Sequence, residues 1–173
     1  MLKALLATVT GAFLLATVSP NQLQAKCDPL VGVWLQNQHV DGDPELVLAA
    51  QVIANADGTL HRNLDVDLQR VINSPLFPEN TVFSISDDYS NWKRVSKHRY
   101  ECLGTQILLI KTPDNTFVPL ARAKCEIEFT LDGNSMTGTE KLTFFDYYDL
   151  TLTVPFVDLP ELTFTIEGQK LVQ

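Results

Sequence analysis

The sequence has few of the residues that usually assemble a metal centre or a nucleophilic site. Its three cysteines form no Cys-x-x-Cys pair, and its three histidines, His39, His61 and His98, belong to no paired spacing. No zinc site is therefore predicted. The sequence around Ser135 lacks the last glycine of a nucleophile elbow, and no glycine-rich phosphate loop is present. We expect no metal, no cofactor and no catalytic set.

Long apolar runs and helical periodicity are also scarce. After residue 25 no apolar stretch is long enough to span a membrane, and no run repeats its apolar residues at helical spacing. Acidic residues outnumber basic ones by 21 to 13, which gives a net charge of −8. This balance disfavours nucleic acid and anionic membranes as partners.

The first 25 residues have the three parts of a secretory signal peptide. Lys3 is their only charge, residues 4–18 are mainly apolar, and Ala25 is a small residue before a plausible cleavage point. The apolar run of about 15 residues is shorter than the ~20 that the alternative, a transmembrane anchor, needs. We expect a signal peptide at 1–25 and one domain at 26–173, secreted or periplasmic, with a net charge of −9 once Lys3 is removed.

Short β-rich runs between turn residues dominate the rest of the chain. The clearest covers 117–131, where apolar and polar residues alternate without exception from Ala121 onward, as in a sheet with one wet face. Asp57-Gly58 and Asp132-Gly133 supply the positive-φ residue of tight hairpins. We expect strands near residues 32–37, 46–54, 59–68, 81–86, 92–103, 105–111, 117–130, 136–145, 150–157 and 162–172.

Consecutive strands joined by short turns predict a meander, and a long meander leaves exposed edges unless it closes. We therefore expect an all-β fold, an up-and-down antiparallel barrel of about 8 to 10 strands. An eight-stranded barrel has an interior just wide enough for one small ligand. A two-sheet sandwich is the alternative. The segment Asn73–Asn80, with two prolines, predicts a loop or lid.

Cysteine spacing favours one disulfide in an oxidising compartment. A hairpin centred near Asp114 would put Cys102 within one position of facing Cys125. We therefore predict a Cys102–Cys125 bond that leaves Cys27 free. The alternative is that Cys27 tethers the N-terminus.

The first expected strand resembles that of a known family. Gly32-Val33-Trp34 is similar to the lipocalin Gly-x-Trp signature, in which the tryptophan closes one end of the barrel. The resemblance covers most of residues 30–145. It implies a calycin-type, lipocalin-like barrel with no shared catalytic set.

Later residues resemble a group of exported bacterial lipocalin-like proteins. Those proteins have Gly-x-Trp-x-Arg, then a tyrosine, an alternating strand and Asp-Gly-x-Ser-aromatic-x-Gly. This chain has Trp92-Lys93-Arg94, Tyr100 and Asp132–Gly138 in that order. It departs from the pattern at Ser90, where the family has glycine, and at Met136, where the family has an aromatic residue.

The basic stretch from residue 92 to residue 100 contains a candidate polar lumen residue. One extended strand there would point five side chains inward: Trp92, Arg94, Ser96, His98 and Tyr100. A buried arginine needs a partner. Arg94 is then expected to pack under Trp34 at the closed end, as the resemblance suggests, or to anchor a ligand carboxylate.

Small residues at inward positions favour a binding lumen, although several phenylalanines could fill it. The first hypothesis is a barrel that binds a small hydrophobic ligand, lined or closed by Trp34, Trp92, Arg94, Tyr100, Ala121, Ala123 and Phe129. The second is a cyclase or isomerase resembling allene oxide cyclase, which needs a buried Glu or Tyr. The third is a protein-binding or inhibitory module that uses the loops Asn73–Asn80 and Asp41–Glu45, with an unknown protein partner.

Overall fold

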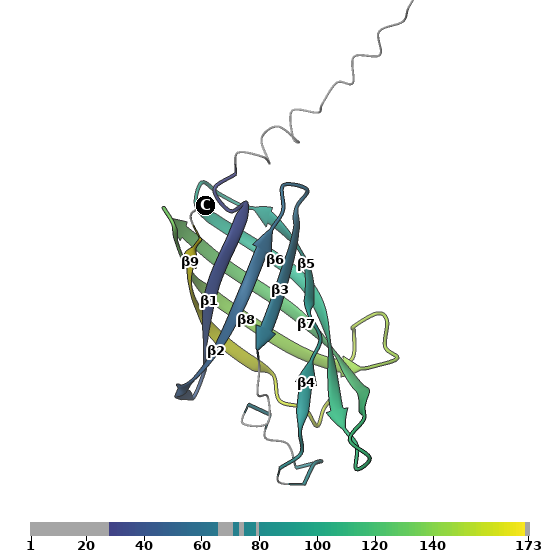
Figure 1. The fold of residues 1–173 in the computed structure, drawn as a ribbon. Helices are drawn as coiled ribbons and strands as arrows, with labels where there is room; N and C mark the ends of the chain where they lie inside the picture. Colours follow the sequence, from purple (N-terminus) through teal and green to yellow (C-terminus); the bar gives the residue numbers. More distant parts are fainter. Residues whose placement is uncertain (1–27, 66–70, 73–74, 79, 172–173) are drawn as a thin grey trace, which may run out of the picture.

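The computed structural model describes residues 28–65, 71–72, 75–78 and 80–171 of the chain (Figure 1). The expected signal peptide and Cys27 lie outside these residues. The described residues form nine strands: β1 (Gly32–Val40), β2 (Asp43–Ala54), β3 (Thr59–Asp65), β4 (Phe83–Ile85), β5 (Asp88–Arg94), β6 (Arg99–Lys111), β7 (Phe117–Asp132), β8 (Ser135–Asp146) and β9 (Leu162–Lys170).

Eight of these strands close into an antiparallel up-and-down barrel. The order runs β1-β2-β3-β5-β6-β7-β8-β9, and β9 pairs with β1, with Trp34 opposite Lys170. The all-β barrel expected from the sequence is confirmed. The described residues contain no helix long and apolar enough to cross a membrane.

β4 and β5 are two parts of one interrupted strand, because both pair with β6. At the interruption the Ser86 N–H donates to the Ile107 carbonyl at 2.9 Å, and the Ile107 N–H donates to Ser86 Oγ at 2.9 Å. The irregularity changes which side chains face inward: Phe83 is buried before it and Asp88 after it. A bulge of this kind re-aims a side chain, and here it turns a carboxylate into the barrel.

Inward side chains form two apolar clusters. The Trp34 cluster comprises Leu30, Trp34, Val52, Ala54, Leu60, Tyr100, Cys102, Ile127, Phe129, Leu131, Met136 and Ile166. The Phe164 cluster comprises Leu48, Val71, Ile72, Phe83, Leu108, Ala121, Ala123, Cys125, Leu142, Phe144, Leu159, Leu162 and Phe164. Each cluster lies toward one end of the barrel.

The end containing the Trp34 cluster is closed by the segment that precedes β1. Leu30 packs into the barrel, and the Trp34 indole N–H donates to its carbonyl at 2.7 Å. Asp28 accepts hydrogen bonds from the Leu30 N–H at 2.9 Å and from the Tyr100 hydroxyl at 2.7 Å. Burial and the hydrogen bond to Asp28 raise the pKa of Tyr100, so the hydroxyl stays protonated as the donor.

The structure differs from the expected strands at three places. The chain turns at residues 95–98, where a continuous strand over 92–103 was expected, and Gly104 lies inside β6 rather than at a break. Residues 150–157 form no strand, apart from an isolated bridge between Phe145 and Pro155. The Asp149 carboxylate accepts the Thr151 hydroxyl at 2.6 Å and backbone N–H groups, including that of Thr151 at 2.9 Å, and holds the segment in turns. The hydrogen bond from the Thr151 hydroxyl, followed by those from the backbone, lowers the pKa of Asp149 to about 2.

We expect Gly138→Ala to destabilise the barrel by ~1–3 kcal/mol, because it overpacks a close strand contact. A Cβ at Gly138 would collide with the Glu128 carbonyl of β7 and lie 2.6 Å from Phe129 Cβ. Urea unfolding measures the change, with Thr137→Ala, an exposed position on the same strand, as the control. Equal stability of the two variants would contradict the tight β7–β8 packing.

Candidate functional site

A layer of polar side chains crosses the barrel between the two apolar clusters. On β8, for example, the inward residues run from Met136 through Glu140 to Leu142, that is, from one cluster to the other. Each member of this polar layer is at most 4% exposed: Gln36, Gln38, Arg62, Asp88, Ser90, Gln106 and Glu140. Side chains so deeply buried must find their partners inside the barrel.

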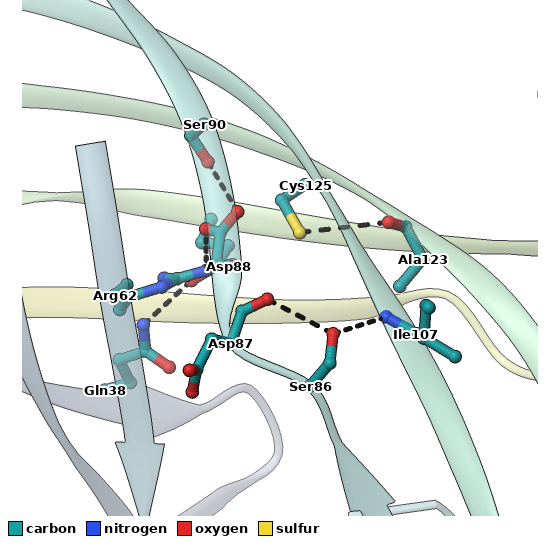
Figure 2. A network of polar contacts seen from close by, with 10 residues as sticks. Gln38, Arg62, Ser86, Asp87, Asp88, Ser90, Ile107, Ala123 and Cys125 are labelled. Carbon is teal, nitrogen blue, oxygen red and sulfur yellow. Dashed lines mark hydrogen bonds and ion pairs between the residues drawn. The ribbon is translucent and has the colours of Figure 1, made fainter. Parts of the chain in front are cut away.

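Arg62 is the centre of the polar layer (Figure 2). Its Nη2 donates to Asp88 Oδ2 at 2.9 Å, and both terminal nitrogens donate to the Glu140 carboxylate. Gln38 Nε2 donates to Glu140 Oε2 at 2.8 Å, and Ser90 Oγ donates to Asp88 Oδ1 at 2.6 Å. Every carboxylate in the layer therefore accepts hydrogen bonds from at least two side chains.

The contact between Arg62 and Glu140 spans the barrel. In the closed ring β3 and β8 are separated by three strands on either side, so they form opposite walls. Burial alone would lower the pKa of Arg62, but Glu140 and then Asp88 outweigh it and raise that pKa above its ordinary value. The guanidinium stays charged and ties the two walls together.

Several buried polar atoms in the layer have no partner among the described residues. They are Gln106 Nε2 and Oε1, Gln36 Oε1 and Arg62 Nε. Gln106 is 1% exposed, and no described residue hydrogen-bonds to either end of its amide. A buried donor or acceptor left unpaired costs ~1–3 kcal/mol, so the Gln106 amide is a place where an added hydrogen-bonding group would be stabilised.

Small residues surround this amide on both strands. Gln106 faces Ala123 on β7, and the next inward residue of β6, Leu108, faces Ala121. On its other side is Gly104, where a Cβ would lie 2.5 Å from Asp88 Oδ1 and 2.8 Å from Ser90 Cβ. The missing side chain of Gly104 therefore leaves room for the Asp88 carboxylate beside Gln106.

Six of the seven residues predicted to line or close the lumen contribute to the interior. Trp34, Tyr100 and Phe129 belong to the Trp34 cluster, with the Tyr100 and Phe129 rings stacked at 5.4 Å. Trp92 is half-buried against the same cluster. The structure places the two alanines, Ala121 and Ala123, at the other end, in the Phe164 cluster.

The expectation that Arg94 points inward is wrong. Its side chain is exposed at the closed end, where Nη1 lies 3.3 Å from Asp28 Oδ2 and Nε donates to the Ser96 carbonyl at 3.1 Å. Ser96 and His98 are also exposed. The cause is the turn at 95–98, which ends the inward-outward alternation that a continuous strand would have kept.

Sequence reasoning missed the buried cation, Arg62, although a signal was available. Between the turn at Asp57-Gly58 and residue 63, apolar Leu60 and Arg62 share one face, and His61 and Asn63 share the other. Asp88 gave no such signal, because the bulge at Ser86 breaks the alternation.

The predicted disulfide is not formed in the structure, where Cys102 and Cys125 are free, buried thiols. The register places Cys102 opposite Ile127 and Cys125 opposite Gly104. The two cysteines are thus diagonal neighbours, for which the Cα separation is ~7–8 Å, beyond the usual reach of a disulfide. Burial raises the pKa of Cys102 to about 12 and that of Cys125 well above its ordinary value.

Exposed apolar side chains gather on a loop other than those expected. The connection between β8 and β9 presents Tyr148, Leu150, Val154 and Val157, with exposed fractions of 69% to 92%. Of the expected loop Asn73–Asn80, residues 73, 74 and 79 lie outside the described part of the chain. Leu76 there is 47% exposed, and Phe77 is half-buried against Phe83.

A groove of about 770 Å³ lies along the outer face of β5 to β8. Its charged lining residues pair with neighbours, as in the Lys93–Glu101 contact at 2.7 Å. Within the described part of the chain, no group of three His, Cys, Asp or Glu residues could hold a metal ion. The unpartnered groups inside the barrel therefore mark it, and not the outer groove, as the candidate site.

Comparison of the chain with models of protein families, with curated proteins and with solved structures finds no match.

Arg62→Met is expected to lower the free energy of unfolding at pH 7 by ~3–5 kcal/mol, because it leaves two buried carboxylates without their cation. Urea unfolding at pH 7 measures the loss. Glu140→Gln, which leaves the Arg62–Asp88 pair, should cost less; an Arg62→Met variant as stable as Glu140→Gln would contradict the electrostatic role of Arg62.

Cys102 and Cys125 should not react with a thiol reagent in the native protein at pH 8, because their raised pKa values keep the thiolate fraction very low. Both should react after unfolding in urea. A Cys27→Ser background restricts the measurement to these two residues. Fast labelling of either thiol in the folded protein would show that the interior opens to reagent.

Proposed function

We propose that the protein is an exported, lipocalin-like barrel that binds one small hydrophobic molecule bearing a polar group inside the barrel. The hydrocarbon part of the ligand contacts the Phe164 cluster, and its polar group bonds to the polar layer. The signal-peptide pattern of residues 1–25 supports the export part of the proposal.

The unpartnered amide of Gln106 carries the proposal. It is 1% exposed, both of its polar atoms lack partners among the described residues, and the residues facing it and Leu108 are alanines. Ligand sites in proteins are mainly apolar with a few polar groups that fix the orientation of the ligand. The apolar Phe164 cluster beside one unsatisfied amide has that composition.

Binding is favoured over the cyclase or isomerase alternative by the bonding of the two carboxylates. A general acid or base must be able to exchange a proton with the substrate. Glu140 and Asp88 instead accept hydrogen bonds from Arg62, Gln38 and Ser90. Both carboxylates are thus engaged with protein donors, as expected of groups that hold Arg62 in place.

Uptake of the neutral fluorescent probe N-phenyl-1-naphthylamine, with displacement by 1-decanol, tests the proposal. We expect Gln106→Leu to weaken decanol binding at least tenfold, about 1.4 kcal/mol. The variant should also raise the free energy of unfolding by ~1 kcal/mol, because it removes unpaired buried polar atoms.

Gln51→Leu, an exposed position on β2, is the matched control and should change neither property. The proposal would be overturned if no decyl compound bound, whether its head group is neutral, positive or negative. A Gln106→Leu variant that is less stable yet binds decanol normally would also overturn it, since buried water would then be the partner of the amide.

A further inference from the structure

The polar layer carries an unbalanced charge. Arg62, Asp88 and Glu140 are each at most 1% exposed, and together they contribute one positive and two negative charges. No other lysine or arginine in the described part of the chain is buried. Among the described residues, two of these three charges compensate each other, and one negative charge remains in the middle of the barrel.

The neutral donors around the two carboxylates stabilise this negative charge by hydrogen bonding but do not neutralise it. The contacts from Gln38 to Glu140 and from Ser90 to Asp88 come from neutral side chains. Arg62 already donates to both carboxylates through its terminal nitrogens. A buried charge without a counter-charge is costly, so a second cation would be strongly favoured there.

Gln106 is an independent indication of where that cation would lie. It follows Gly104 on the inward face of β6, and Gly104 lies directly against the Asp88 carboxylate. Its Oε1 is buried and has no donor within the described residues. A flip of the amide would only exchange the positions of its unpaired donor and its unpaired acceptor. An unpaired acceptor beside an excess negative charge matches an N–H donor that is itself positive.

We propose that the ligand of this barrel is a small hydrophobic amine, bound as its ammonium ion between Gln106 and the Asp88–Glu140 pair. This inference rests on the proposed function and specifies its ligand class. The hydrocarbon part extends toward Leu108, Phe144 and Phe164 of the Phe164 cluster. The ammonium group supplies both the missing positive charge and the missing donor.

Three decyl compounds that differ only in the head group test the inference on the full-length protein. Decylamine is protonated at pH 7, 1-decanol is neutral and decanoate is negative. Displacement of N-phenyl-1-naphthylamine should rank them in that order, with decylamine at least tenfold tighter than decanol. The measurement is made in 0.5 M NaCl, because the net charge of −8 would otherwise attract ammonium ions to the outer surface.

Glu140→Gln makes the charges of the layer balance while it keeps the shape of the side chain. We expect this variant to lose the preference for decylamine over decanol, and a cooperative urea unfolding transition reports that it is folded. Asp88→Asn is the second variant and should behave alike. Glu128→Gln, an exposed position on β7, is the matched control and should keep the preference.

The outcomes separate this inference from the proposed function. If none of the three compounds binds, the proposed function fails and the inference fails with it. If decanol binds as tightly as decylamine, the proposed function stands and the inference is overturned, because a ligand cation then gives no advantage in the polar layer. If decanoate binds best, or if Glu140→Gln keeps the preference for the amine, the inference is overturned and the proposed function stands.

Discussion

A guanidinium held between two carboxylates in the middle of a closed barrel is the constraint on which the rest of this structure depends. Arg62 reaches from β3 to Glu140 on the opposite wall and to Asp88 on β5. A group buried in this way is tolerated only when its partners are in place, because removing one leaves an uncompensated charge. The two apolar clusters bury the layer from either side, and the strands position the partners at the same level of the barrel.

This constraint also selects the strand register. A slip of one residue in β3 would move Arg62 to the outer face and turn His61 inward, because side chains alternate along a strand. The two carboxylates would then be buried without their cation. Apolar side chains tolerate rearrangement more easily, since Leu and Phe pack against many neighbours. The charged layer therefore distinguishes the native pairing more sharply than the clusters around it.

The strands that the sequence predicted best are those in which inward and outward side chains alternate without interruption. β7 alternates from Ala121 to Leu131 and lies where the pattern indicated, and the barrel follows from a succession of such strands. The errors arise where a distant contact decides the local structure. Gly104 lies within a strand because Asp88 and Ser90 occupy the space of its missing side chain, and neither contact can be read from neighbouring residues.

The same distinction separates the site residues that the sequence predicted from those that it missed. Tyr100 and Phe129 were predicted because aromatic residues at alternating positions point into a barrel, and Trp34 because Gly32-Val33-Trp34 resembles a lipocalin signature. Asp88 was missed because the bulge at Ser86 shifts the pattern just before it. Arg94 was predicted as the lumen cation instead of Arg62 because a basic segment next to a tryptophan resembled a lumen strand, although it forms a turn closed by the Val95–Arg99 hydrogen bond.

The direct contact between β1 and β9 affects the order in which the barrel can assemble. Each neighbour of β9 is β8 or β1, so the ring cannot close until residues 162–170 have left the ribosome. A circular permutant with a linker between the ends, opened at the Gly133-Asn134 turn, would retain every strand pairing of the barrel while changing the order in which the strands are synthesised.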